Sequence, residues 1–251
     1  MELTLDYSEL CALLVEAGVN APAGMDVTSF PAVNDSSRQE ILAAGRSELS
    51  VRQDGPAQGL VQVLARPTAV LHVTRWQENK IEQDFWFFHT SVQTVRLHKK
   101  AAEQYTLTTV SGETAVLEQI QQFLPLQTVQ PSLTYRITVD EEEFENLRDL
   151  ASEWEEVPSL ATLEADGLEL VAAKDLFDSA VEPQWRGVVE FMRLHGNDIV
   201  HTYTVRALQG QEVAWLVRPY AADPRKVLIE TAQAGELQKA LESSWRLVAS
   251  A

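Results

Sequence analysis

Two stretches of the chain share one pattern of hydrophobic and polar positions. The first, Ala69–Leu97, holds three apolar-rich segments separated by short polar turns, which predicts an antiparallel meander of strands. A weaker copy runs from Gly187 to Val217, and a shift of 118 positions aligns the two stretches without a gap. The aligned pairs include Val73 with Phe191, Phe85 with Tyr203, Val95 with Val213 and Leu97 with Trp215.

The middle segment of the first meander, Ile81–Thr90, is apolar on both faces. Phe85 and Phe87 alternate along it with Trp86 and Phe88. Because successive side chains of a strand point to opposite faces, both faces of this strand need a covering layer. We therefore predict that the strand lies in the middle of a sheet that is covered on both sides.

A second repeated pattern marks the start of two helices. Asp6 is a favourable N-cap, and Glu9 follows three residues later, which is the spacing of a capping box. An amphipathic segment follows, with its apolar residues on one face. The same pattern returns 134 positions later, where Asp140 and Glu143 stand in the equivalent places.

Between each of these starts and the next meander, the pattern predicts a helix, a short strand and a second helix. In the first half, the helix covers Ser37–Ala44 and the strand covers Leu49–Arg52. In the second half, the helix covers Pro158–Glu164, the strand Leu168–Ala172 and the second helix Asp175–Val181. A helix–strand–helix segment is also typical of a winged-helix fragment, which would indicate DNA binding.

Each meander is followed by a fourth strand and a closing helix. The fourth strands are predicted at Tyr105–Val110 and Lys226–Thr231, and the helices begin near Gly112 and Gly235. The order of elements therefore occurs twice. The polar, proline-marked segment Gln127–Pro131 separates the two copies.

These patterns predict an α+β fold that is internally duplicated, with quasi-two-fold symmetry and a central antiparallel sheet flanked by helices. Residues 1–130 and 131–251 are the two α/β repeats, as subdomains of one compact unit. Each four-stranded half alone would leave two strand edges exposed, so we expect the halves to join their sheets. We expect the helices on one face of the sheet and at both ends.

Composition and charge restrict the possible partners. About 45% of the 251 residues are hydrophobic, which suits a globular protein with a sizeable core. The formal net charge of −17 argues against nucleic acid and anionic membrane surfaces, including the DNA of the winged-helix interpretation. No apolar run is long enough to span a bilayer, and the N-terminus lacks the signal-peptide pattern. We expect a cytoplasmic monomer or homodimer.

The sequence contains no pattern of a catalytic or nucleotide-binding site. It lacks the GxGxxG, phosphate-loop, HExxH and GxSxG patterns. His72 and His89 lie on predicted strands, where a sheet could bring them within ligand distance of each other. We interpret the histidines as ordinary hydrogen-bonded or surface side chains. The prediction is therefore that the chain has no catalytic, cofactor-binding or metal-binding residues.

The six tryptophans follow strand and helix periodicity, so most of them are expected in the core. Trp76 and Trp185 lie at the ends of predicted elements. They are therefore the candidates for exposed tryptophans that anchor a partner.

Three parts of the chain form a further pattern. They are the N-terminal LTLDYSEL with the following LLVEAG, the stretch LVQVLARPTAVLHV, and the closing RPYAADPRKVLIE with GELQKAL. Together these segments resemble the EspG family of chaperones of type VII (ESX) secretion, over nearly the whole chain. The resemblance implies a duplicated α/β build around a central antiparallel sheet. It also implies a non-enzymatic cytosolic chaperone that binds the hydrophobic tip of a helical PPE protein in a PE–PPE heterodimer before export.

The same resemblance implies where the partner binds, because the contacts of the family come from the central sheet and the C-terminal helical bundle. On the strand Asp198–Leu208 of this chain, one face is polar enough to stand in water, and the loop Gln77–Lys80 is a further candidate. The predicted partner-binding residues are Trp76, Gln77, Trp185, Val200, Thr202, Thr204 and Arg206.

Two other functions remain open from the sequence. A small-ligand-binding protein would have an aromatic pocket between sheet and helices around Phe85, Phe87 and Trp215. An enzyme would bring His72 and His89 together with a carboxylate. We rank the chaperone first, the ligand-binding protein second and the enzyme third.

Overall fold

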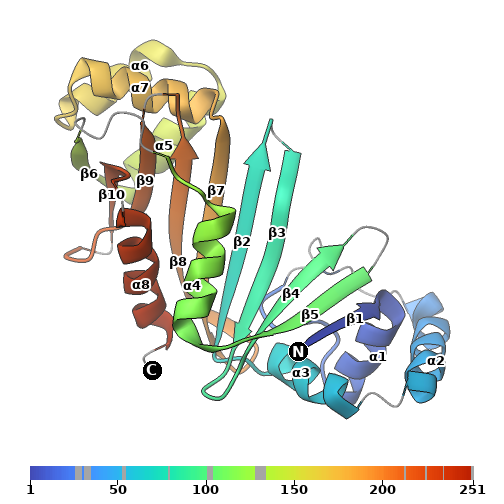
Figure 1. The fold of residues 1–251 in the computed structure, drawn as a ribbon. Helices are drawn as coiled ribbons and strands as arrows, with labels where there is room; N and C mark the ends of the chain where they lie inside the picture. The colour runs from blue at the N-terminus through green and yellow to red at the C-terminus, as the bar shows by residue number, and fades with distance from the viewer. Residues whose placement is uncertain are drawn as a thin grey trace.

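One antiparallel sheet of ten strands lies at the centre of the part of the chain that the computed structural model describes (Figure 1). The described residues are 1–25, 30, 35–52, 55–78, 80–100, 104–127, 134–211, 213–223, 225–233 and 235–249. The strands are β1 (Glu2–Asp6), β2 (Ala69–Gln77), β3 (Lys80–His89), β4 (Thr94–Lys100), β5 (Gln104–Val110), β6 (Arg136–Asp140), β7 (Trp185–His195), β8 (Asp198–Gln209), β9 (Ala214–Pro219) and β10 (Lys226–Thr231). Their order in the sheet is β1-β5-β4-β3-β2-β7-β8-β9-β10-β6.

The helices among the described residues follow the same order in each half of the chain. They are α1 (Tyr7–Glu16), α2 (Asp35–Arg52), α3 (Gly55–Ala65), α4 (Gly112–Phe123), α5 (Glu141–Ser152), α6 (Glu156–Ala165), α7 (Leu170–Val181) and α8 (Glu236–Ala249). None of these described helices has both the length and the hydrophobicity needed to cross a bilayer.

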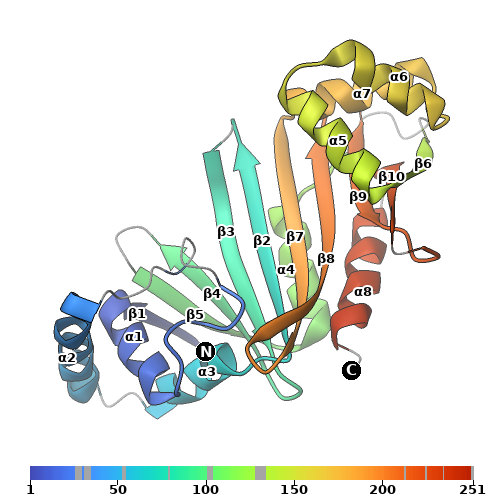
Figure 2. The same cartoon turned by 180° about the vertical axis from the view of Figure 1, so that it is seen from behind.

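Helices lie across one face of the sheet and at both of its ends, as predicted, and the two end groups lie on the opposite face (Figures 1 and 2). Helices α4 and α8 lie across the middle of one face, where Phe87 and Phe191 pack beneath them. Helices α1–α3 cover one end of the opposite face, and α5–α7 cover its other end (Figures 1 and 2). The strands buried on both faces explain this arrangement, because one helical layer cannot cover both.

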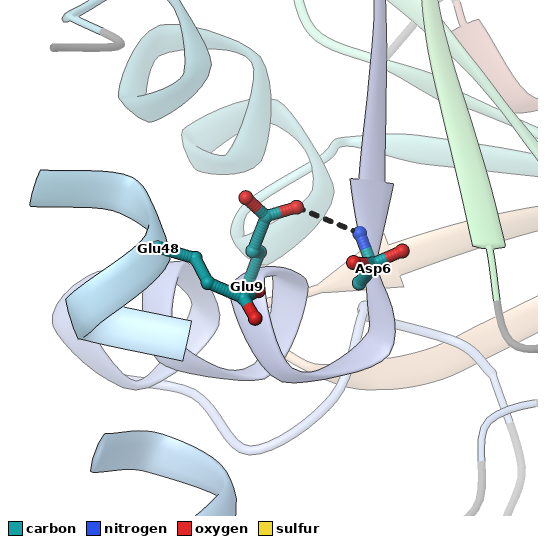
Figure 3. Close-up of side chains that lie close together, drawn as sticks. All are labelled: Asp6, Glu9 and Glu48. Carbon is teal, nitrogen blue, oxygen red and sulfur yellow. Dashed lines mark hydrogen bonds between the residues drawn. The ribbon is translucent and has the colours of Figure 1, made fainter. Parts of the chain in front are cut away.

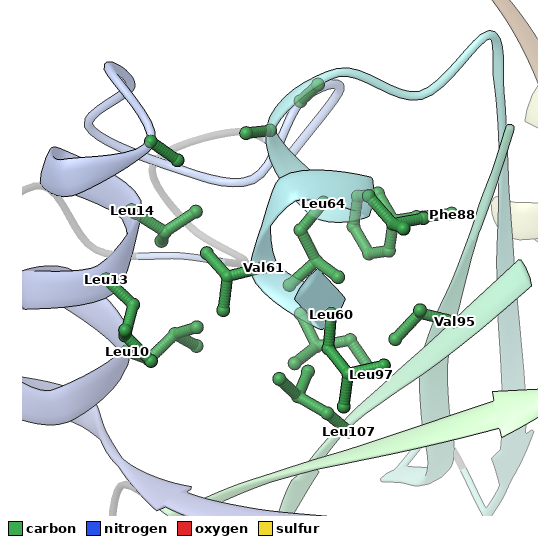
Figure 4. Close-up of a cluster of buried hydrophobic side chains, with 14 of the residues drawn as sticks. Leu10, Leu13, Leu14, Leu60, Val61, Leu64, Phe88, Val95, Leu97 and Leu107 are labelled. Carbon is green, nitrogen blue, oxygen red and sulfur yellow. The ribbon is translucent and has the colours of Figure 1, made fainter. Parts of the chain in front are cut away.

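Strand β3 has a core on each side, as its sequence predicts. Phe85 and Phe87 lie in the core beneath α4 and α8, whereas Trp86 and Phe88 lie in the core beneath α1–α3. Figure 4 shows part of the latter core, in which leucines of α1 and α3 meet Phe88 and strands β4 and β5. Each large apolar side chain buried there contributes roughly 1.5–3 kcal/mol relative to full exposure.

Both predicted helix starts are confirmed. Asp6 is the N-cap of α1, and its backbone N–H donates to Glu9 Oε2 at 2.8 Å, which completes the capping box. Asp140 is the N-cap of α5, but the structure assigns no capping box there. The carboxylates in the first turn of α5 still lie favourably at the positive end of the helix dipole.

Two predicted short strands are wrong, because both segments are helical or lead into a helix. Leu49–Arg52 is the end of α2, so the helix predicted at Ser37–Ala44 is much longer. Leu168–Ala172 precedes and then enters α7. Short apolar segments do not distinguish a strand from a helix by periodicity. Tertiary packing favours the helix for the second segment, because Ala172 and Leu176 lie about one helical turn apart and are buried in the same core.

Strand pairing follows the 118-position shift through the first two strands of each meander. Leu71 pairs with Phe87 in β2–β3, and the equivalent Val189 pairs with Val205 in β7–β8. The register also shifts at equivalent places, after Arg75 in β2 and after Arg193 in β7. The two hairpins are therefore built alike down to their irregularity.

The gapless alignment fails at the next strand. Phe88 pairs with Val95, and its counterpart Arg206 pairs with Val217, so Val95 corresponds to Val217 rather than to Val213. The β8–β9 hairpin is longer than β3–β4, because the pairs Leu208–Trp215 and Gln209–Ala214 extend it.

The two halves thus share their element order and most of their strand register. That they descend from one duplicated segment remains a prediction, as does their division into subdomains. The predicted boundary between residues 1–130 and 131–251 lies at residues 128–133, outside the described residues.

The close packing of α2 on α1 gives a first prediction. A Cβ added at Gly45 of α2 would lie 2.1 Å from the carbonyl oxygen of Ser8 and 2.5 Å from its carbonyl carbon. Because these are backbone atoms, the helices must separate to accept Gly45→Ala. We expect the substitution to lower the free energy of unfolding by roughly 2 kcal/mol, measured by urea denaturation.

Gly59→Ala is the matched control. Gly59 lies inside α3, and an added Cβ would meet nothing within 4 Å. Only the higher helix propensity of alanine then changes the stability, and we expect the free energy of unfolding to rise by up to about 1 kcal/mol. A Gly45→Ala protein as stable as the wild type would contradict the packing described here.

Candidate functional site

The middle of one sheet face stays uncovered between the two groups of helices, α1–α3 and α5–α7. Figure 2 views this face, with bare strands β2, β3, β7 and β8 between the groups. Cross-strand pairing places polar side chains of all four strands on it. We define the open face by His72, Thr74, Trp76, Asp84, Arg186, Val188, Glu190, Thr202, Thr204 and Arg206.

His72 lies at the centre of the open face, directly opposite Glu190 in the β2–β7 pair. Its Nδ1 lies 3.0 Å from Glu190 Oε2, and its Nε2 lies 2.7 Å from Asp84 Oδ1. The imidazole stacks on Trp86, with ring centroids 3.9 Å apart and planes at 12°. Two carboxylates and one imidazole therefore form a fixed cluster in the middle of the face.

The charge of this cluster depends on the protonation of His72. Burial alone would lower the pKa of His72, but hydrogen bonds and charge from Asp84 and Glu190 outweigh it and raise the pKa to about 9. His72 is thus an imidazolium at neutral pH, with both ring N–H groups donating to carboxylates.

A cavity of about 450 Å³ adjoins the open face on the side of α5–α7. Side chains of β2 and of β7 to β10 form one wall, and side chains of the three helices form the other. The lining is mostly apolar, and its charged members are Arg148, Arg186 and Arg206, with no carboxylate among the lining residues. We call this space the arginine cavity.

Two of the three guanidinium groups lie over aromatic rings. Arg186 lies over Trp76 at 5.4 Å from the ring centroid, and Arg206 lies over Phe144 at 5.3 Å. Such contacts favour the cation by roughly 0.5–2 kcal/mol. Burial lowers the pKa of Arg206, and the charge of Glu145 opposes that shift.

The structure brings several of the predicted partner-binding residues to this region. Trp76 is half-buried at the wall of the arginine cavity, and Gln77 beside it is exposed. Thr202, Thr204 and Arg206 form a row on the open face. Asn79 of the predicted loop Gln77–Lys80 lies outside the described residues.

Val200 departs from that row. The register passes from the pair Arg193–His201 directly to the pair Leu194–Ile199, so Val200 is the extra residue of a bulge. Its side chain is exposed, as predicted, although its alternation with Thr202 is interrupted.

The prediction that Trp185 is an exposed anchor for a partner is wrong. It is only 7% exposed and lies in the core beneath α4 and α8, with the Arg75 guanidinium 5.1 Å from its ring centroid. It begins β7, and the alternation of that strand directs it to the covered face together with Val189.

The predicted aromatic pocket is also wrong in its place. Phe85 and Phe87 lie in the core beneath α4 and α8, whereas Trp215 lies on the opposite side of the sheet in the core beneath α5–α7. All three are fully buried. Sequence alone did not point to the arginine cavity, since its walls are far apart along the chain.

His72 and His89 do not come together. His89 lies on the other face of the sheet, where its ring contacts Trp245 of α8 at 5.0 Å and its Nδ1 lies 2.9 Å from Thr94 Oγ1. Burial lowers the pKa of His89. The histidine pair that the enzyme hypothesis requires is therefore contradicted.

Three carboxylates also lie near each other at the start of α1. Ligand atoms of Asp6, Glu9 and Glu48 all lie within 4.8 Å of one another (Figure 3). Glu9 closes the capping box with the backbone of Asp6, as the dashed line in Figure 3 marks. Helix capping accounts for the approach of Asp6 and Glu9, and we assign no metal to the three carboxylates.

The raised pKa of His72 predicts a pH dependence of stability. Its unfolded value is 6.5 and its folded value about 9, so the contribution is complete below pH 6.5 and is lost as the pH rises through 9. We expect a loss on the order of 1–3 kcal/mol, reduced by the partial exposure of both carboxylates. Urea denaturation between these pH values measures it.

His72→Gln should remove most of this slope, because a neutral amide replaces the imidazolium. His195→Gln is the control, since His195 is an exposed histidine at the end of β7. An unchanged slope in His72→Gln would show that other groups titrate instead.

Comparisons with known proteins identify the fold. No protein-family profile matches the chain, and no curated protein sequence matches it. A solved structure does match, namely the Mycobacterium tuberculosis type VII secretion system chaperone EspG5 in complex with the PE25–PPE41 dimer. The match has a TM-score of 0.71 and 13% sequence identity, and it covers 99% of this chain and 97% of that chain. The chain therefore has the fold of a type VII secretion chaperone, as its resemblance to the EspG family predicts.

Proposed function

We propose that this protein is a chaperone that binds the hydrophobic tip of a helical, PE–PPE-like secreted heterodimer before type VII secretion. The observation that carries the proposal is the similarity, over nearly the whole of both chains, to a chaperone solved in complex with such a dimer. We further propose that it acts in the cytoplasm, as a monomer or a homodimer, without a catalytic step.

The surface of this chain supports a protein partner. The open face offers side chains from four strands, including exposed Thr202 and half-buried Thr204. Beside it, Trp154 between α5 and α6 is 63% exposed and lines the arginine cavity. Val157, Leu170 and Val171 on α6 and α7 are exposed as well. These exposed apolar side chains all belong to α6, α7 and the turn before α6, and exposed apolar surface supports a protein partner.

The small-ligand alternative has less support. The aromatic pocket that motivated it does not form, since its three residues lie in two separate cores. The arginine cavity has the size of a ligand site. The similarity to a chaperone solved with a protein dimer nevertheless favours a protein as the partner.

The proposal predicts a complex. Coexpression with PE–PPE-like pairs from the native host should give a stoichiometric complex on size-exclusion chromatography. Thr202→Arg places a large cation in the middle of the open face without disturbing a buried group. We expect it to weaken binding about tenfold, because an interface charge without a partner must be desolvated.

Thr114→Arg is the matched control. Thr114 is exposed in the first turn of α4, on the other side of the sheet, and its substitution should leave the affinity unchanged. If no PE–PPE-like pair of the host binds the wild-type protein, the proposed function is wrong. If the two substitutions have equal effects on the affinity, the open face is not part of the interface.

A further inference from the structure

A second cavity, with a volume of about 450 Å³, lies between the turn before α6, helix α7 and the turn after β8. Its charge is opposite to that of the arginine cavity, because four carboxylates and no cation are among its lining residues. Trp154 lines both cavities. We call this second space the acidic pocket and define it by Trp154, Glu156, Asp178, Ser179, Glu182 and Gly210.

The chain itself neutralises only part of the charge of the acidic pocket. Lys174 Nζ lies 2.9 Å from Glu156 Oε1 and 3.5 Å from Asp178 Oδ1. Asp175, the fourth lining carboxylate, accepts a hydrogen bond of 2.8 Å from the indole N–H of a core tryptophan. Glu182 is exposed and forms no ion pair among the described residues. One ammonium group therefore serves several carboxylates, and Glu182 is left to pair with a further cation.

A buried hydroxyl in the same pocket also lacks a partner. Ser179 is only 3% exposed, and its hydroxyl forms no hydrogen bond within the part of the chain that the structure describes. The hydroxyl lies against Gly210, where an added Cβ would overlap Ser179 Oγ. Since Ser179 and Gly210 both line the pocket, a donor that enters the pocket can reach this oxygen. Such a donor would remove the cost of a buried hydroxyl without a hydrogen bond.

Trp154 adds an exposed aromatic surface to these polar groups. Its side chain is 63% exposed, so a partner can still cover the indole ring. An arginine side chain fits this combination, because a guanidinium stacks on aromatic rings while its N–H groups donate to carboxylate and hydroxyl oxygens. The chain uses the first of these contacts internally, where Arg186 lies over Trp76.

The charge of the helices around the pocket indicates what carries the arginine. Residues 141–182, which include α5–α7, contain fourteen acidic and two basic residues. Their formal net charge of −12 is most of the −17 of the whole chain. An acidic surface of this extent attracts a basic protein segment and speeds its association, whereas a single small cation would use little of it.

We propose that the acidic pocket binds an arginine side chain from a basic segment of a partner protein. The guanidinium stacks on Trp154, pairs with Glu182 and donates to the hydroxyl of Ser179. The other basic residues of the segment lie over the acidic surface of α5–α7. This inference does not rest on the proposed chaperone function, and it gives the protein a binding site besides the open face.

Two peptides test the pocket. One has a central arginine flanked by lysines, and in the other citrulline, the neutral isostere of arginine, takes its place. The arginine peptide should bind the full chain about fivefold more tightly, and it should shift the indole N–H resonance of Trp154 in an NMR titration. Equal affinities would overturn the proposal, because the lysines would then account for the binding.

Glu182→Gln and Ser179→Ala should each reduce the preference for arginine over citrulline to about twofold or less. Glu164→Gln is the control for charge, since Glu164 is exposed on α6 and does not line the pocket. Ser244→Ala is the control for the hydroxyl, since Ser244 is also 3% exposed but lies in α8.

Both control proteins should keep the fivefold preference. If they lose it as well, or if Glu182→Gln keeps it, the pocket does not recognise arginine and the proposal is wrong. Glu182 is exposed, so its substitution should leave thermal unfolding unchanged and gives a result even if Ser179→Ala does not fold.

The size of the ligand separates a protein segment from a small cation. Nα-acetylarginine amide has no basic neighbours, so it should bind more weakly than the arginine peptide, and the difference should shrink at high salt. If the two ligands bind equally, the pocket is a site for a small cation and the basic segment is wrong.

Discussion

The structure depends on one antiparallel strand pair, β2 with β7, which joins the two halves of the sheet. Ala69–Trp76 pairs with Arg186–Arg193 without a break, so neither half exposes an edge at the centre, where an unpaired strand would be a liability. The pairing also places His72 opposite its own counterpart, Glu190, 118 positions away. The local quasi-two-fold axis of the pair therefore passes between these two residues, and the cluster with Asp84 joins side chains from both halves.

From this junction follows the division of the sheet into a covered face and an open face. Helices α4 and α8 both cover the middle of one face, which buries the junction from that side. The remaining helices lie at the ends of the other face, and the centre of that face is left to solvent or to a partner. A joined sheet thus produces a docking surface as a consequence of where its helices lie. The charges of the polar cluster at the centre of this surface are paired, so these side chains do not need a layer of helices packed over them.

The sequence predicts much of this fold and less of the candidate site. Strands with clear alternation, such as β3, and helix starts with a capping pattern, such as Asp6 with Glu9, are set by local chemistry and are confirmed. The failures have local causes too. The segment Leu49–Arg52 is too short to reveal a period, and Trp185 is placed by the phase of a strand whose first residue was not evident. The arginine cavity needs α5–α7 to meet β7 and β8, which are contacts between segments distant in the chain. A single sequence carries no direct signal for them.

The contrast between an acidic protein and a positively charged cavity has a consequence for specificity. At physiological salt the Debye length is about 8 Å, so most of the surface carboxylates act only on groups close to them. Arg148 and Arg186 are exposed and Arg206 is half-buried, so their charges act mainly on groups in direct contact with them. Glu145 already pairs with Arg148 and Arg206. Arg186 is the lining arginine that has no ion pair among the described residues, and an anion that reached it would not displace a carboxylate of this chain. Any discrimination by unsatisfied charge in this cavity therefore depends on Arg186 rather than on all three arginines.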